Sequence, residues 1–185
     1  MQVEVEHAGN FKLRFVVHNP KCPDMSRLFD FAIINLLFLV NKEDIIMDNH
    51  SRIITPVEKI GDTGEANIQM LFHPLFKDCG MPQHYLNMIM KLSVKENELQ
   101  YTSHVNQDTP DFITALNNDI RPPKPIPIHK MDINIEFPGP GMASVVISFL
   151  VDNENYNFKS QKDRMIKMIF KKMFSRLKEF IEKLT

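Results

Sequence analysis

Three side chains of the types that bind metals or act as nucleophiles lie near one another in the middle of the sequence: His73, Cys79 and His84. Imidazole and thiolate groups are common zinc ligands, and a thiol becomes a nucleophile when a histidine takes its proton. The spacing of these residues matches no standard zinc pattern, and neither a fourth ligand nor a local activating base is evident. We therefore predict no metal site and no catalytic cysteine here.

Asp62-Thr63-Gly64 is the tripeptide with which aspartic proteases present a carboxylate that activates water. In this sequence, however, Gly61 precedes it where an apolar strand residue is needed, and Glu65 adds a charge after it. The stretch is better explained as a turn. A glycine-rich phosphate loop is also missing, because Gly139 and Gly141 alternate with prolines instead of opening a helix. These patterns predict a protein that is not an enzyme and needs no cofactor.

The elements that would position a site are clearest in the last third of the chain. Met131–Phe137 alternates apolar and polar residues, which predicts a half-exposed strand. Pro138–Gly141 then reverses the chain, because proline fixes φ and glycine accepts the positive φ of tight turns. Ala143–Val151 is apolar and β-branched on both faces, so we expect a central strand that is covered on each side.

A helix of about 24 residues follows from Ser160, with Asp163 completing a variant of the capping box. Apolar positions fill about half of its circumference. The other half is mainly basic, and the helix carries eight basic residues against three acidic ones, a net charge of +5 in a chain of net charge −1. The candidate partner-binding residues on the basic face are Arg164, Lys167, Lys171, Lys172 and Lys178. The candidate cavity-lining residues on the apolar face are Phe170, Met173, Phe174 and Leu177.

Two upstream stretches bear on the domain organisation. Leu28–Val40 is apolar almost all round, which predicts a helix buried in the core or at a subunit interface, and it is too short to cross a bilayer. Arg121–Pro127 is proline-rich and predicts a stiff linker or wrapping strap instead of a regular element. We treat residues 1–185 as a single domain, because the C-terminal hairpin and helix would struggle to bury their own apolar face.

These patterns together predict an α+β fold. A curved antiparallel sheet of about six to eight strands is packed by the helix at Leu28–Val40 and by the long C-terminal amphipathic helix. The other expected elements are a hairpin or interrupted strand within Val3–Val17, strands at Arg52–Ile60 and Ala66–Phe72, helices at Pro82–Met90 and Asp111–Asn117, and paired strands at Leu92–Val94 and Leu99–Thr102.

Composition narrows the class of protein. The net charge of −1 and the pI near 6.7 argue against a dedicated nucleic-acid binder. Cys22 and Cys79 make no disulfide framework, and the N-terminal sequence has neither a secretory nor a transit pattern. We therefore expect an intracellular protein, cytoplasmic by default, without a transmembrane segment.

Ile147–Asn153 followed by a long helix resembles the ending of the small subunits that scaffold the actin-related-protein branching complex. The resemblance covers about 40 residues and implies a scaffold role by analogy. Our first hypothesis is a non-enzymatic scaffold subunit that contacts other protein subunits through the basic helix face and the proline-rich strap. The alternative is a carrier of a small apolar ligand or lipid, because a long helix across a curved sheet resembles the helix-grip arrangement, whose cavity holds apolar ligands.

Overall fold

The computed structural model of the chain describes residues 2–7, 10–40, 52–60, 63–73, 82–110, 112–113, 122–151 and 159–184. The helical segments are the 3-10 helix η1 (Met25–Phe29) and the α-helices α1 (Phe31–Val40) and α3 (Lys159–Lys183). The strands are β1 (Gln2–His7), β2 (Asn10–His18), β3 (Arg52–Ile60), β4 (Thr63–Leu71), β5 (His84–Lys95), β6 (Glu98–Val105), β7 (Lys124–Pro125), β8 (Ile128–Gly139) and β9 (Met142–Val151).

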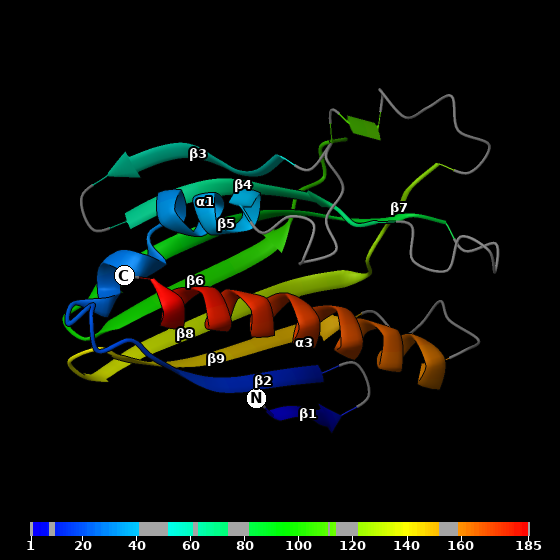
Figure 1. Cartoon of the computed structure of the whole chain (residues 1–185). Helices are drawn as coiled ribbons and strands as arrows, with labels where there is room; N and C mark the ends of the chain where they lie inside the picture. The colour runs from blue at the N-terminus through cyan, green and yellow to red at the C-terminus, as the bar shows by residue number, and fades with distance from the viewer. Residues whose placement is uncertain are drawn as a thin grey trace.

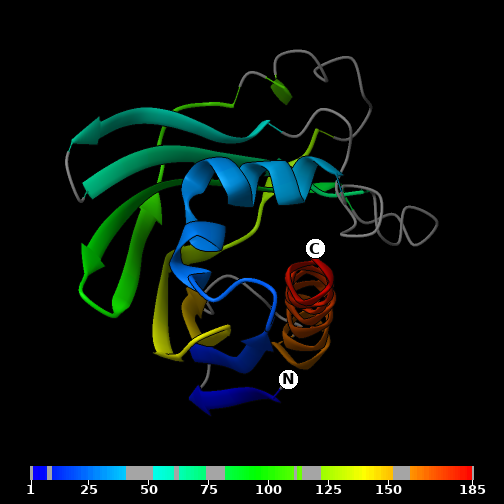
Figure 2. The ribbon, with the colours of Figure 1, turned by 60° about the vertical axis from the view of Figure 1, so that its left-hand side comes forward.

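The strands form one nine-stranded sheet that curves around the helices (Figure 1; Figure 2). The strand order is β1-β2-β9-β8-β6-β5-β4-β3, and each neighbouring pair in this order is antiparallel. β7 lies off this path and pairs with β5 in parallel. Figure 2 looks nearly along α3 and shows the sheet bending around α1 and α3. The predicted α+β fold, with helices packed on a curved antiparallel sheet, is confirmed.

The register of the strands places a row of apolar side chains across the concave face of the sheet. Leu13 pairs with Ile147, which pairs with Ile133, and the row continues through Tyr101 to Leu92. Because successive side chains point to opposite faces of a strand, the neighbouring row faces outward. That outward row is polar and consists of Lys12, Ser148, Asp132, Thr102 and Lys91. The sheet is therefore amphipathic, and its concave side needs an apolar cover.

Several predicted elements are confirmed. The N-terminal stretch is the hairpin β1–β2, the paired strands around residues 95–98 are the ends of β5 and β6, and the final hairpin is β8–β9. Arg52–Ile60 is β3, and the strand predicted at Ala66–Phe72 overlaps β4. The segment predicted as a helix at Asp111–Asn117 lies mostly outside the described residues.

The helix predicted at Pro82–Met90 is wrong, because this stretch belongs to strand β5. Tyr85, Leu86, Ile89 and Met90 have helical spacing, but Leu86, Met88 and Met90 alternate as the buried side of a strand. β5 lies between β4 and β6 and hydrogen-bonds to both. The hydrogen bonds to these two neighbouring strands therefore make the segment a strand, although the spacing of its apolar residues also fits a helix.

The proline-rich strap was predicted to have no regular structure, yet Lys124 and Pro125 form β7. The backbone N–H of Lys124 donates to the carbonyl of Gln83 at 2.8 Å, and that of Ile126 donates to the carbonyl of Tyr85 at 2.8 Å. Proline lacks an N–H, so only the residues on either side of Pro125 donate. This added pairing makes nine strands, one more than the expected maximum.

The central strand β9 was predicted to be covered on both faces, which is wrong. Its position between β2 and β8 is central, and Val145, Ile147 and Phe149 are buried on the concave side. On the convex side Ser144, Val146 and Ser148 are half-buried, and Leu150 is 42% exposed. No helix of the described chain covers this face in Figure 2.

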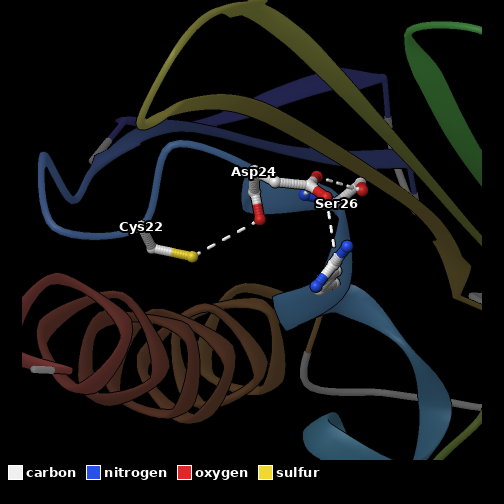
Figure 3. Close-up of polar contacts among 4 residues, drawn as sticks. Cys22, Asp24 and Ser26 are labelled. Carbon is white, nitrogen blue, oxygen red and sulfur yellow. Dashed lines mark hydrogen bonds and ion pairs between the residues drawn. The ribbon is translucent and has the colours of Figure 1, made fainter.

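Two aspartates cap the helical segments here: Asp24 precedes η1, and Asp30 divides the apolar stretch at Leu28–Val40 into the end of η1 and the predicted helix, α1. Figure 3 shows the first, Asp24, whose carboxylate accepts hydrogen bonds from the backbone N–H and the hydroxyl of Ser26 at the start of η1. The Ser26 hydroxyl is the main cause that lowers the pKa of Asp24. Asp30 then accepts from the backbone N–H of Ala32 at 2.7 Å and caps α1. These caps satisfy amide groups that a helix start leaves without partners.

Aromatic rings fix the middle of α3 on the sheet. Phe11 stacks on Phe149 at 5.1 Å between ring centroids, and Phe149 stacks on Phe170 of α3 at 4.6 Å. Phe174, one turn further along α3, lies 6.3 Å from Phe15 of β2. These distances are typical of attractive ring contacts. The ring contacts set the separation between α3 and the strands beneath it.

The C-terminal end of α3 is held by the side chain of Asn19, which is only 1% exposed. Its amide donates to the carbonyls of Ile181 at 2.7 Å and Leu184 at 3.0 Å, two carbonyls at the end of the helix. The backbone of Asn19 in turn donates to the carbonyl of Gly141 in the β8–β9 turn at 2.8 Å. One residue thus connects the end of α3 with that hairpin.

We predict that Gly141→Ala destabilises the fold by about 2 kcal/mol or more. Gly141 has a φ of 69°, and an added Cβ would lie 2.6 Å from the carbonyl oxygen of Asn19. The control is Gly139→Ala in the same turn, where a Cβ meets nothing within 4 Å. Urea unfolding of both variants measures the difference, and equal losses would contradict the role of the Asn19 contact.

Candidate functional site

An apolar cavity that is partly open to solvent lies between the concave face of the sheet, α1 and α3. The space between atoms amounts to about 800 Å³ when open solvent at its edge is included, and about 80 Å³ of it can hold the centre of a water molecule. A single water needs roughly 10–15 Å³ by the second measure. The cavity therefore has room for several waters or one small organic molecule.

The lining comes from η1, from both α-helices and from six strands, so it exists only in the folded chain. Four methionines are among its residues, and these flexible side chains adapt to ligands of different shapes. From the helical segments the lining residues are Phe29, Phe31, Ile34, Phe38, Phe170, Met173, Phe174, Leu177, Lys178 and Ile181. From the strands they are Phe15, Ile68, Met70, Leu86, Met90, Tyr101, Met131, Ile133, Ile135, Val145 and Ile147.

Tyr101 is one of two lining residues that carry a polar group, and its hydroxyl is engaged with a partner outside the lining surface. The side chain is 1% exposed, and its hydroxyl donates to the backbone carbonyl of Phe29 at the end of η1. Burial, with a contribution from the carboxylate of Asp30, raises the pKa of Tyr101 above its ordinary value. The hydroxyl therefore stays protonated and positions η1 over the sheet.

Lys178 on α3 is the other, and it lines the cavity with its carbon chain. Its ammonium pairs with the carboxylate of Glu182, one turn further along the helix. The same Glu182 oxygen, Oε1, accepts a hydrogen bond from the backbone N–H of His18 at 3.1 Å. The two side chains are 27% and 28% exposed, so the ion pair lies where the cavity approaches the surface.

The predicted site residues fall into two groups in the structure. The four apolar residues Phe170, Met173, Phe174 and Leu177 all line the cavity. The predicted basic face is not one continuous surface, because Lys178 also lines the cavity. The ammonium of Lys167 lies 6.0 Å from the ring centre of Phe11, within cation–π range. Lys171 and Lys172 are exposed, and Arg164 lies where only the backbone is described.

The lining residues on the strands and on α1 were not predicted as a site. Their apolar character was visible in the sequence, but only the strand register brings Ile133, Tyr101 and Ile147 into one row under the helices. The alternation along Met131–Phe137 was the one signal in the sequence that could have identified them, since it separates the apolar face of this strand from its polar face. For α1, Phe31 and Phe38 are buried while Leu36, Leu39 and Val40 are 54%, 47% and 63% exposed. This helix is thus buried on one side only.

Only some of the residues that were weighed for chemistry lie in the described part of the chain. Within the described residues, no three His, Cys, Asp or Glu side chains lie close enough to hold a metal ion. Cys79 and Asp62 lie outside the described residues, and Thr63 and Gly64 begin strand β4 instead of forming the predicted turn. No three-residue metal site or protease-like loop can be assigned in this part of the chain.

Solved structures share this arrangement of sheet and helices. Human StAR-related lipid transfer protein 5 has a TM-score of 0.60 and 10% identity, over 98% of this chain and 86% of that one. Human STARD10 has a TM-score of 0.59 and 8% identity, over 98% and 73%. The lipid transfer and protein localization domain of human StarD13 has a TM-score of 0.55 and 10% identity, over 95% and 78%. Identities this low show a common fold alone.

No protein-family model and no curated protein sequence matches the chain. The prediction of a scaffold subunit in a multiprotein complex is nevertheless wrong. The chain has the fold of two structures named as lipid-transfer proteins, and an apolar cavity lies at its helix–sheet interface, both of which favour the carrier alternative. Nothing supports the predicted contacts with other protein subunits. Among the described helices, none has the length and apolar character needed to cross a bilayer.

We predict that Tyr101→Phe lowers the free energy of unfolding by about 1–3 kcal/mol, because it leaves the buried carbonyl of Phe29 without its donor. The matched control is Tyr85→Phe, since Tyr85 lies outside the cavity, half-buried, with its ring edge against Phe112. We expect the control to change stability by less than about 0.5 kcal/mol. Urea denaturation measures the free energy of unfolding of both variants. An unchanged value for Tyr101→Phe would show that the hydroxyl does not hold η1.

Proposed function

We propose that this chain is a non-enzymatic carrier that encloses a small apolar ligand or lipid between α3, α1 and the concave face of the sheet. The observation that carries the proposal is the cavity itself, whose lining surface is apolar, while the polar groups of Tyr101 and Lys178 are engaged with Phe29 and Glu182. Binding pockets for small molecules are mostly apolar. An apolar ligand or the apolar body of a lipid suits this lining.

The fold supports this assignment because α3 is fixed over the concave face of the sheet, with the cavity between them. α3 is held at its C-terminal end by Asn19 and along its length by Phe170 and Phe174. Transfer of apolar surface from water into such a space contributes about 25 cal/mol per Å². An apolar molecule therefore gains free energy by entering, without any reaction. The structures with the same fold that are named as lipid-transfer proteins agree with a carrier.

The lack of apparent reactive groups in the lining favours binding over catalysis. The Tyr101 hydroxyl stays protonated and is engaged with the carbonyl of Phe29, and Lys178 is paired with Glu182. General acid–base catalysis needs a group that is free to exchange a proton with the substrate near the working pH. We accordingly propose no reaction for the ligand.

A single substitution tests the carrier function directly. Phe174→Trp adds volume to a cavity-lining position and introduces tryptophan into a chain that has none. We expect the variant to bind the neutral apolar dye N-phenyl-1-naphthylamine about tenfold more weakly, because the larger ring occupies space that the ligand needs. Dye fluorescence measures affinity, and tryptophan emission reports whether the cavity still takes up the dye.

The matched control is Met168→Trp, which places the same side chain on α3 at a position that is 47% exposed and outside the lining. Its dye affinity should equal that of the original chain. Thermal unfolding of both variants checks that each is folded. Dye binding that is equally strong in all three proteins would place the ligand elsewhere, and absence of dye binding in the original chain would overturn the carrier proposal.

A further inference from the structure

The helix α1 is apolar on both of its sides. Its ten residues, Phe31–Val40, include no charged side chain, and Asn35 is the one polar residue among them. One side of the helix lines the cavity through Phe31, Ile34 and Phe38. A helix at the surface of a globular protein normally turns a polar side to the solvent. The composition of the opposite side of α1 therefore needs an explanation.

That outward side carries three exposed apolar side chains. Leu36, Leu39 and Val40 are 54%, 47% and 63% exposed. Leu39 and Val40 follow Leu36 by three and four residues, so the three side chains are neighbours on one face of the helix. Single exposed apolar residues are normal, whereas a contiguous group on a monomer is often functional. We call these three residues the α1 patch.

The size of the α1 patch suits a membrane better than a protein partner. Three side chains that are each about half exposed offer on the order of 300 Å². A stable protein–protein interface takes about 800 Å² from each partner. A lipid bilayer sets no such minimum, because every apolar side chain that enters it contributes separately to binding. The α1 patch is therefore large enough for shallow insertion into a membrane surface and too small for a stable dimer.

The neighbouring helix supplies a charge that complements an anionic membrane surface. Figure 2 shows α1 and α3 on the same side of the sheet, and the two helices are in contact. From Ser160 onward α3 has a net charge of +5, in a chain of net charge −1. At about 100° per residue, Lys172 and Lys183 lie on the side of α3 opposite to Phe170, which lines the cavity. Both lysines are exposed.

We propose that the α1 patch inserts into an anionic membrane surface and that Lys172 and Lys183 contact the phosphate groups of its lipids. This inference rests on the proposed carrier function and names its partner, the bilayer from which the ligand is taken or to which it is delivered. Because the inner side of α1 lines the cavity, the docked helix has lipid on one side and the cavity on the other. An apolar ligand then moves between the two with little exposure to water.

The test is co-sedimentation of the full chain with vesicles of phosphatidylcholine that contain about 30% phosphatidylserine, an anionic lipid. Leu36→Gln with Leu39→Gln should lower the affinity for these vesicles about tenfold, because two apolar side chains no longer enter the lipid. Glutamine is a good helix former, so α1 is retained. The matched control is Val16→Gln with Leu150→Gln, which changes two side chains, 47% and 42% exposed, on the convex face of the sheet. The control should bind as the original chain does.

The charges of α3 are tested on the same vesicles. Lys172→Gln with Lys183→Gln should also weaken binding about tenfold, because each basic residue near an anionic surface adds to the attraction. The matched control is Lys91→Gln with Lys95→Gln, which removes two lysines that are 59% and 58% exposed on the convex face of β5. Added salt should weaken binding of the original chain. Equal binding to vesicles of pure phosphatidylcholine would overturn the anionic preference.

Dye binding separates this inference from the carrier function. The changed residues of α1 and α3 lie outside the lining, so both double variants should bind N-phenyl-1-naphthylamine as tightly as the original chain. Vesicle binding that Leu36→Gln with Leu39→Gln leaves unchanged would overturn the α1 patch, while intact dye binding would leave the carrier function standing. An original chain that binds vesicles but no dye would overturn the carrier function alone. A dimer in sedimentation velocity that this variant dissociates would assign the α1 patch to a second copy of the chain instead of a membrane.

Discussion

The two hydrogen bonds from the amide of Asn19 to the last carbonyls of α3 are the interaction on which the rest of the arrangement depends. A helix end that is buried must find partners for its free carbonyls, and water cannot supply them at a residue that is 1% exposed. Asn19 supplies them from the chain between β2 and η1. Because its backbone also bonds to the β8–β9 turn, the end of the helix, the hairpin and the start of η1 form one unit.

The cavity follows from the way α3 is supported. Aromatic contacts from Phe149 and Phe15 hold the helix above the strands at ring-to-ring distances of 4.6 and 6.3 Å. A curved sheet under a straight helix leaves space that side chains of these sizes do not completely fill, and α1 covers the remaining side in Figure 2. The last turns of α3 are also tied to β2, because the backbone N–H of His18 donates to the carboxylate of Glu182.

The fold could be predicted from the sequence where one periodicity dominates. The alternation in β8 and the amphipathic pattern of α3 identified both elements and four of the five apolar residues of α3 that line the cavity; Ile181 was not predicted. β5 could not be predicted locally, because Leu86 and Met90 fit both a helix and a strand and only the neighbouring strands decide. The strand half of the site depends on register between distant segments. Lys178 was predicted from its charge to contact a partner, and only the structure shows that its carbon chain also lies along the cavity.

The strand order starts at β1 and stops at β3, and in the described chain these two edges do not pair with each other. A closed barrel has a fixed radius, but an open sheet can change its curvature while every ladder hydrogen bond remains. The volume of the cavity can therefore change with the curvature of the sheet. Hydrostatic compression should flatten that volume before it breaks the ladders, and unfolding under pressure should be accompanied by a decrease in total volume to which the empty cavity contributes.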